Sequence, residues 1–513
     1  MVVNLAVFSY GMVHHAVGDH DLLFFNGYPA EIGYLSGRWF QGALNLLAFN
    51  TTAPIYIQLL TIVFQVLAAM SMIILWTPQA GIRELVLGGL VVCLMPFVSW
   101  HHYYRSSSYF FSFPQLTMIL ALVLCTSASF NWKKILAGIL LVTISLATYN
   151  PAVQTYAVGW AGLLCLRLSR WDGTGRELVR VLKSLAPSAM VAVAGGLLYY
   201  ATALWLTHQG LMDNTGYLSM SATRSPAEML AVIPEVIAAS LRHLRYSQQF
   251  LPASLKSFLL LMVYLGLFCL ILKAWSVNQF KLRRLLAVTA AVALVFLCSK
   301  LVFVIIQGTG RYYAERIAQM GLSYVYLFFI LAALDSGWQT AKELCSFFLI
   351  LVILPYMSVC NLRAQETFVL LAQHDFAVAN RVLAKMESRL GAGLGSGQYA
   401  FVQLGSWKSL NDHLNNRYAR IKPYPFRTLP RTSGKLVFHR LSAEFEPKSY
   451  YTISSSPDDN PPPPPDVVQA AGLAVGQKPF PDDDFIGVYG DVVVLLFDSE
   501  ARDDVLRRAA VHQ

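Results

Sequence analysis

Charged residues are scarce in this chain of 513 residues: Asp, Glu, Lys and Arg together make up 13%, whereas 56% of the residues are hydrophobic. The hydrophobic residues fall in blocks long enough to cross a bilayer, which excludes a soluble globular fold. Cysteine is also sparse. All seven cysteines lie inside or at the end of apolar blocks, so they predict neither a disulfide framework nor a metal site.

The formal net charge of +10 does not indicate a nucleic-acid partner. The basic residues gather in short loops between apolar blocks, which is the pattern of membrane topology. We therefore predict a lipid bilayer, and no nucleic acid, as the surroundings of this chain.

Eleven apolar blocks approach the roughly 20 residues that a membrane-spanning helix needs. They predict an all-α polytopic membrane domain over residues 1–360 with about eleven transmembrane helices. The blocks cover residues 2–17, 55–76, 85–100, 114–129, 135–149, 152–168, 186–206, 256–274, 285–306, 317–335 and 343–360.

Alternate loops differ sharply in Lys and Arg, and the basic loops are expected on the cytoplasmic side. The basic set holds Lys133, Lys134, the stretch 167–183, the stretch 273–284 and Lys342. This predicts a multi-pass protein of the bacterial inner membrane with a cytoplasmic N-terminus. The external, periplasmic set then includes two large loops, 18–54 and 207–255. The first block is short for a span, and a start codon upstream of Met1 is one explanation.

After Cys360 the pattern changes to alternating amphipathic helix and strand. We predict a small periplasmic α/β domain over residues 361–448, with helices at 365–390 and 407–419 and strands at 399–404 and 435–441. Residues 449–513 are interpreted as a linker, because of the prolines at 461–465, and a poorly defined tail. Whether the strand-like run 492–497 joins the domain is left open.

The first external loop places Asp19, Asp21, Glu31 and Arg38 within twenty residues beside the membrane. Glycosyl transfer needs a carboxylate to take the proton of an attacking hydroxyl and a cation to stabilise a departing phosphate. This loop offers both, so we predict Asp21, Asp19 and Glu31 as candidates for the catalytic base. The alternative is that the aspartates cap the next helix and that Arg38 lies at the membrane interface.

Three further external segments carry candidate binding residues. Arg105 could contact phosphate, or could belong to an aromatic belt at the membrane interface. Asn150 and Gln154 could hydrogen-bond a sugar, or could simply form a helical hairpin turn. Arg311 and Arg316 could grip a lipid phosphate, or could pair with Glu315 or with head groups.

A resemblance to a known family rests on several of these segments. The stretch from Asp19 to Trp39, with its acidic pair, then NGY, then SGRW, resembles the first external loop of the bacterial and phage O-antigen glucosyltransferases, the serotype-converting, type-II-like group. The resemblance continues at residues 149–154, at 311–316 and at the D-x-x-x-A pattern that starts at Asp375. It covers about residues 5–440.

The resemblance implies a GT-C-like transferase that takes glucose, or a related hexose, from an undecaprenyl-phosphate sugar and attaches it to lipopolysaccharide O-antigen or another surface glycan. It implies that an acid of the first external loop acts as base. It also implies that Arg38, Arg311 and Arg316 hold the carrier phosphate, with Tyr28 in the same loop as a further binding residue. No cofactor is implied with certainty, and a divalent cation stays open.

Two other function classes remain as alternatives. An O-antigen polymerase or ligase would carry its chemistry on the large central loop, where His208, Arg224 and His243 lie. A lipid-linked sugar flippase or transporter would place ionisable residues in the middle of its spans, whereas the blocks here carry few charges and the acids gather at one face.

Overall fold

The computed structural model describes sixteen stretches of the chain, in which two compact units are distinguished. The described residues are 1–13, 38–47, 54–96, 98–103, 108–126, 131–211, 224–245, 252–276, 282–305, 311–391, 394, 396–405, 438, 445, 447–453 and 464–511. We call the described residues up to Gln365 the membrane unit and those from Glu366 onward the C-terminal unit.

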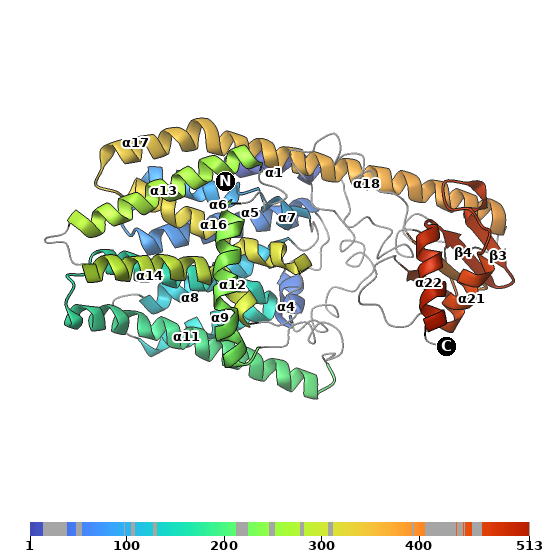
Figure 1. The fold of residues 1–513 in the computed structure, drawn as a ribbon, viewed down its shortest axis with the longest axis horizontal. Helices are drawn as coiled ribbons and strands as arrows, with labels where there is room; N and C mark the ends of the chain where they lie inside the picture. Colours follow the sequence, from blue (N-terminus) through green and yellow to red (C-terminus); the bar gives the residue numbers. More distant parts are fainter. Residues whose placement is uncertain are drawn as a thin grey trace. The chain divides into compact units, whose positions relative to one another are not determined.

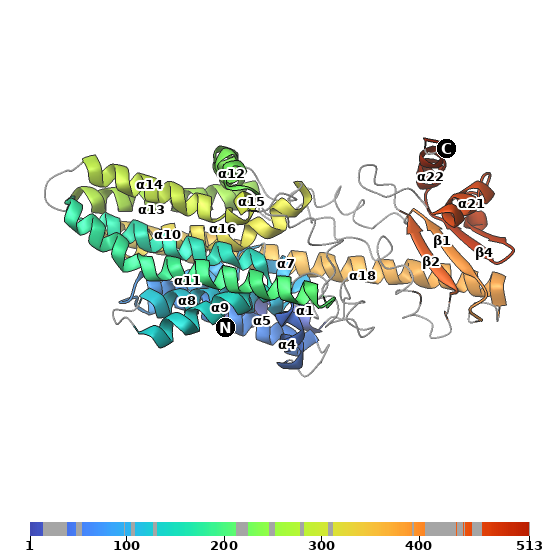
Figure 2. The same cartoon turned by 90° about the horizontal axis from the view of Figure 1, so that it is seen from below.

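The membrane unit is entirely helical in the part of the chain that the structure describes (Figures 1 and 2). Its helices are α1 (Val2–Val13), α4 (Phe40–Leu47), α5 (Pro54–Trp76), α6 (Ile82–Cys93), α7 (Val98–Tyr103), α8 (Tyr109–Thr126), α9 (Trp132–Thr148), α10 (Val153–Ser169), α11 (Gly175–His208), α12 (Pro226–Arg245), α13 (Ala253–Ser276), α14 (Leu282–Cys298), α15 (Leu301–Ile305), α16 (Arg311–Leu334), α17 (Gln339–Phe348) and the first part of α18 (Leu354–Leu390). A short π-helical segment, Leu349–Ile353, joins α17 to α18.

Each apolar block found in the sequence overlaps helix, because a backbone in lipid has to satisfy its own hydrogen bonds. The blocks 85–100, 285–306 and 343–360 are each divided between two helices. Within the described residues, five helical segments are long and apolar enough to cross a membrane: Ile55–Trp76, Tyr109–Thr126, Gly175–His208, Ser254–Trp275 and Gln339–Leu390. The chain is therefore a membrane protein. The count of about eleven spans stays a prediction.

Small residues let the central helices approach one another closely. Gly159 and Gly162 of α10 face Trp76 and Met72 of α5, where any added Cβ would lie within about 3 Å of those side chains. The indole nitrogen of Trp76 donates to the carbonyl of Gly159 at 3.0 Å. This pattern of glycine at a helix interface and a tryptophan packed on it is typical of helices that associate within lipid.

The helix bundle has two chemically different ends. At one end, which we call the basic end, α8, α10, α13 and α16 finish and α9, α11, α14 and α17 begin, and most of the Lys and Arg residues of the basic stretches lie on these helix ends (Figure 1). At the opposite end α9 turns into α10, and α14 breaks before α15. Helix α12 contacts α14 and α15; it runs across the direction of the bundle in Figure 1 and is seen nearly end-on in Figure 2.

The C-terminal unit contains a four-stranded mixed sheet. Its strands are β1 (Ala400–Leu404), β2 (Ser449–Ile453), β3 (Ile486–Tyr489) and β4 (Val492–Leu496), in the order β2-β1-β4-β3. Strand β1 runs parallel to both neighbours, and β3 pairs antiparallel with β4. The second part of α18 covers one face of the sheet, whereas α21 (Pro465–Leu473) and α22 (Ser499–Val511) cover the other.

The course of the chain after residue 448 differs from the sequence prediction of a linker and a poorly defined tail. Residues 449–453 form β2, and Val492–Leu496 form β4 in the middle of the sheet. The physical reason is that both faces of β4 are covered: Val493 and Leu495 pack toward α18, and Val494 and Leu496 pack toward α21 and α22. The predicted helix at 407–419 lies outside the described residues, as does the predicted strand at 435–441 apart from Phe438.

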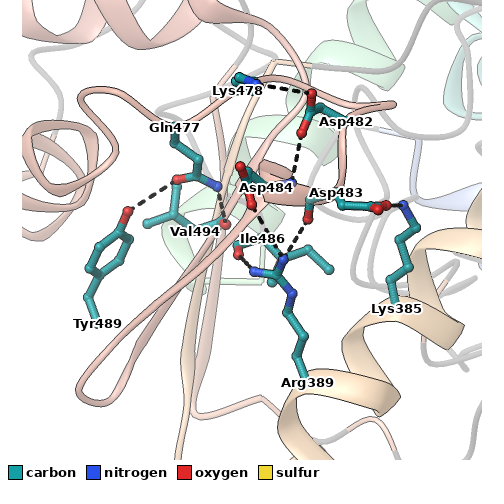
Figure 3. Close-up of polar contacts among 10 residues, drawn as sticks. All are labelled: Lys385, Arg389, Gln477, Lys478, Asp482, Asp483, Asp484, Ile486, Tyr489 and Val494. Carbon is teal, nitrogen blue, oxygen red and sulfur yellow. Dashed lines mark hydrogen bonds and ion pairs between the residues drawn. The ribbon is translucent and has the colours of Figure 1, made fainter.

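Polar contacts fasten α18 to the turn before β3 (Figure 3). Lys385 forms an ion pair with the carboxylate of Asp483, and Arg389 donates to the carbonyl of Asp483 at 2.7 Å and to that of Ile486. The hydrogen bond and the positive charge of Lys385 lower the pKa of the Asp483 carboxyl. These contacts fix the angle at which α18 crosses the sheet.

Candidate functional site

A break in the backbone separates α9 from α10 at the end of the bundle opposite the basic end. Tyr149 is extended, with φ −158° and ψ 101°, and Asn150–Ala152 form one turn of 3-10 helix before α10 begins at Val153. Pro151 favours this break because it cannot donate to a continuing helix. The amide of Tyr149 still bonds the carbonyl of Ser145 at 2.8 Å. The polar turn predicted at residues 149–154 is therefore present.

Helix α4 is fastened to this break at the point where the first external loop ends. The guanidinium carbon of Arg38 lies 4.9 Å from the centre of the Tyr149 ring. The side-chain nitrogen of Gln41 donates to the carbonyl of Thr148 at 3.0 Å. A guanidinium that stacks on an aromatic ring is held in place by the attraction between the cation and the ring. Arg38 is thus positioned as a fixed cation beside the turn.

Asn150 extends the same cluster toward α11. Its amide nitrogen donates to the hydroxyl of Tyr199 at 3.2 Å, and the positive charge of Arg38 also acts on that hydroxyl. The amide oxygen of Asn150 is buried and has no hydrogen-bond partner among the described residues. We call Arg38, Tyr149, Asn150 and Tyr199 the turn cluster. It combines a cation, two phenol rings and an unsatisfied acceptor.

Gln154 is the second residue of α10 and is fully buried. Within the described ranges neither atom of its amide group has a hydrogen-bond partner, and the hydroxyl of Thr155 has none. Leaving such groups unpaired costs about 1–3 kcal/mol each, so polar groups this deep are normally compensated by a ligand or by water. The sequence left two interpretations of Gln154, a sugar contact or part of a helical hairpin turn, and the sugar contact stays a prediction.

Helix α16 passes directly beside Gln154. A Cβ on Gly321 would lie 3.1 Å from the Cβ of Gln154 and 3.0 Å from the carbonyl oxygen of Ser299. The backbone of Arg316 lies five residues earlier in α16, about 7.5 Å along the axis. The structure therefore brings the start of α16 to the turn cluster's end of the bundle. The side chains of Arg311 and Arg316 are outside its description.

Lys300 is a buried cation that the sequence reasoning missed. It follows Ser299 at the break between α14 and α15, is 1% exposed, and has its ammonium 5.7 Å from the centre of the Phe303 ring. A lysine inside a block predicted to span, 285–306, was itself the signal, because an ionisable group there is costly and usually functional. Through Ser299 and Gly321 it is connected to Gln154.

A second polar region borders the turn cluster through aromatic contacts. The ring of His101 stacks on Phe111 at 5.0 Å, and Phe111 meets Tyr149 edge-on, also at 5.0 Å. His101 and Gln65 line a closed cavity of about 10 Å³, which has room for about one water molecule. Among the described residues, Nδ1 of His101 and both polar atoms of the Gln65 amide have no hydrogen-bond partner, so one water molecule in this cavity could bond to them.

Several predicted residues cannot be placed. Asp19, Asp21, Tyr28 and Glu31 lie in the segment 14–37, and Arg105 lies in 104–107, all outside the described residues. Across the described ranges, no group of three or more His, Cys, Asp or Glu side chains is arranged to hold a metal ion. The structure thus unites Arg38 with Asn150, places Gln154 beside α16, and leaves the three acids as predictions.

Comparisons with known proteins assign the class. A family model described as glucosyl transferase GtrII matches residues 14–333. This is more than half of the chain, so the protein belongs to the glucosyl transferase GtrII family and is a membrane glycosyltransferase. No curated protein matches. Among solved structures, the apo crystal structure of ArnT from Cupriavidus metallidurans is similar at 12% identity and a TM-score of 0.32, over 79% of this chain and 81% of that one.

Proposed function

We propose that this glycosyltransferase moves glucose, or a related hexose, from an undecaprenyl-phosphate sugar to lipopolysaccharide O-antigen or another cell-surface glycan on the periplasmic side of the bacterial inner membrane. One observation carries the proposal: a fixed guanidinium, Arg38, borders a turn whose amide, Asn150, has an unpaired buried oxygen. A phosphate and a sugar are the two groups that such a pair recognises together.

The proposed chemistry is a single displacement at the anomeric carbon. The acceptor hydroxyl oxygen bonds to that carbon, the bond from carbon to phosphate oxygen breaks, and the hydroxyl proton passes to a carboxylate of the first external loop. Asp21 and Asp19 are the first candidates for this base and Glu31 is the third. The departing undecaprenyl phosphate keeps its negative charge against Arg38, and we assign Arg311 and Arg316 the same duty.

Asn150 and Gln154 would hold the sugar. Each offers both a donor and an acceptor, which suits hydroxyl groups, and the amide oxygen of Asn150 is already buried without a described partner. Tyr199 keeps the Asn150 amide in one orientation through the 3.2 Å hydrogen bond. Tyr28 and Arg105 are proposed as outer contacts of the same substrate.

The test measures the rate at which purified protein transfers glucose from undecaprenyl-phosphate-glucose to a matching lipopolysaccharide. The single variants compared are Asp21→Asn, Asp19→Asn, Glu31→Gln and Arg38→Gln. Loss of the base should lower turnover by about 10²–10⁴-fold with donor binding intact. Arg38→Gln should instead weaken donor binding, by about ten- to a hundredfold for a charge-assisted contact.

Glu343→Gln is the matched control, because Glu343 is an exposed acid at the basic end. It should transfer glucose as the unaltered protein does. Full activity in all three acid variants would refute a base in the first external loop. Failure of the unaltered protein to use any of several polyprenyl-phosphate sugars would refute the donor class and would favour a polymerase, a ligase or a transporter.

A further inference from the structure

A large cavity with a charged rim lies at the basic end, on the far side of the bundle from the turn cluster. It occupies about 580 Å³ where α8 and α10 finish and α9 and α11 begin. Its charged lining consists of Lys134, Arg167, Arg170, Glu177 and Arg180. A volume in this range is typical of pockets that hold a small molecule or part of a larger one. Glycosyl transfer as proposed above uses none of these residues.

The charged lining is strongly positive. Four cations and one carboxylate give a net charge of +3, and Glu177 is already paired with Arg180 at 2.8 Å. Helix dipoles do not produce this field, because two helices begin and two end at the cavity and their contributions oppose one another. The side chains alone therefore make the cavity a site for an anion.

Side-chain contacts at the helix ends hold the cations of the cavity in place. Arg167 of α10 donates to the hydroxyl of Ser184 in α11. The Asn131 side chain accepts from the backbone of Lys133 and fixes the start of α9, one residue from the cavity's Lys134. The positive charges are therefore attached to a defined frame of helix ends and not to long loops.

The cavity becomes apolar farther along the helices. Leu124, Ile135, Val181 and Pro187 continue its lining toward the middle of the bundle. The outward faces of two of the surrounding helices are exposed and apolar as well, at positions such as Leu140 in α9, and only 17% of the apolar window of α11 is buried. A ligand that arrives from lipid could enter between these surfaces.

We propose that this cavity binds the phosphate headgroup of an anionic phospholipid, with the acyl chains against its apolar wall. Arg167 and Arg170 can hold phosphate oxygens in bidentate fashion, and Lys134 adds a third charge. Basic pockets between the ends of transmembrane helices favour such headgroups. The apolar wall favours a lipid over a free phosphate ion, because a free phosphate ion would contact only the charged rim of the cavity.

The experiment measures how lipids shift the thermal unfolding of the purified full chain in detergent. Phosphatidylglycerol is titrated against phosphatidylcholine with the same acyl chains and against inorganic phosphate. The test variant is Lys134→Gln with Arg170→Gln. The matched control is Arg176→Gln with Lys183→Gln, which removes the same charge from exposed positions of α11 that do not line the cavity.

Phosphatidylglycerol should stabilise the unaltered protein more than phosphatidylcholine does, and its apparent affinity should fall at least about tenfold in the test variant and less than about twofold in the control. Equal loss in both variants would assign the effect to diffuse surface charge and overturn the proposal. An equal shift with phosphatidylcholine, or with inorganic phosphate at the same concentration, would also overturn it. If the double variant does not fold, the single variant Arg170→Gln, at an exposed position, replaces it, and its affinity for phosphatidylglycerol is compared with that of the control variant.

Discussion

Replacing Gly321 by alanine should damage the candidate site through the backbone. The new Cβ would lie 2.9 Å from the Cα of Ser299, 3.0 Å from its carbonyl oxygen and 3.1 Å from the Cβ of Gln154. Favourable contacts between carbon atoms begin at about 3.5 Å, so α16 has to withdraw by about half an ångström. Two of the obstructing atoms are backbone, which cannot rotate away.

Overpacking of this kind costs about 1–3 kcal/mol, and the better helix propensity of alanine returns at most about 1 kcal/mol. We therefore expect Gly321→Ala to lower the free energy of unfolding by about 1–2 kcal/mol. Turnover should fall further, by about ten- to a hundredfold, because a displaced α16 carries Arg316 with it, the residue that we propose to hold the donor phosphate.

The assay pairs thermal unfolding with glucose transfer, and Gly89→Ala serves as the control. Gly89 is a helical glycine of α6 with no atom within 4 Å of the added Cβ, so its alanine variant should be at least as stable as the unaltered protein. Equal stability and equal turnover of the two variants would refute the inferred contact between α16 and the Ser299–Gln154 region.

Three further predictions test separate parts of the molecule. Gln154→Leu should keep or raise thermal stability, because it removes an unpartnered buried amide, yet should abolish transfer; retained activity would mean that Gln154 does not bind sugar. Gly266→Ala should lower thermal stability more than Gly321→Ala does, because its added Cβ would lie 2.0 Å from the carbonyl oxygen of Phe329. If this variant unfolds at the same temperature as the unaltered protein, the packing of α13 on α16 is contradicted. Asp483→Asn should destabilise the protein at pH 7 but not in acid below the folded pKa of the carboxyl. This pKa is lowered, so the contribution of the ion pair is present above the unfolded pKa near 4 and is lost as pH falls through the folded pKa; a difference between variant and unaltered protein that persists in acid would exclude the ion pair as its cause.

Hydropathy predicted where the helices lie, because a spanning backbone has to be both apolar and helical. It could not predict their neighbours. The turn at Tyr149 was visible from its Asn-Pro pair, but the partner of Asn150 is Tyr199, which lies 49 residues later in an apolar helix. Nothing in the local pattern of α11 distinguishes that tyrosine from others facing lipid.

Two features went against local patterns. Lys300 sits among apolar residues, so its charge did not stand out from the mean hydropathy of that stretch, although the fold buries it. The proline run at 461–465 resembles the start of a disordered tail, yet α21 begins at Pro465, a position where proline suits a first helical turn. Long-range pairing in the sheet, and not local propensity, decides that the residues beyond it fold.

The position of β4 has a consequence for how the protein is made. Strand β1 leaves the ribosome some ninety residues before β4, its inner neighbour in the sheet. Until residues 492–496 are synthesised, one edge of β1 has no partner, and an unpaired edge can pair with another chain. A ribosome that stops shortly before Val492 would release a protein with its whole membrane bundle but with a sheet that cannot close. The codons for residues 492–496 therefore determine whether the sheet of the C-terminal unit can close.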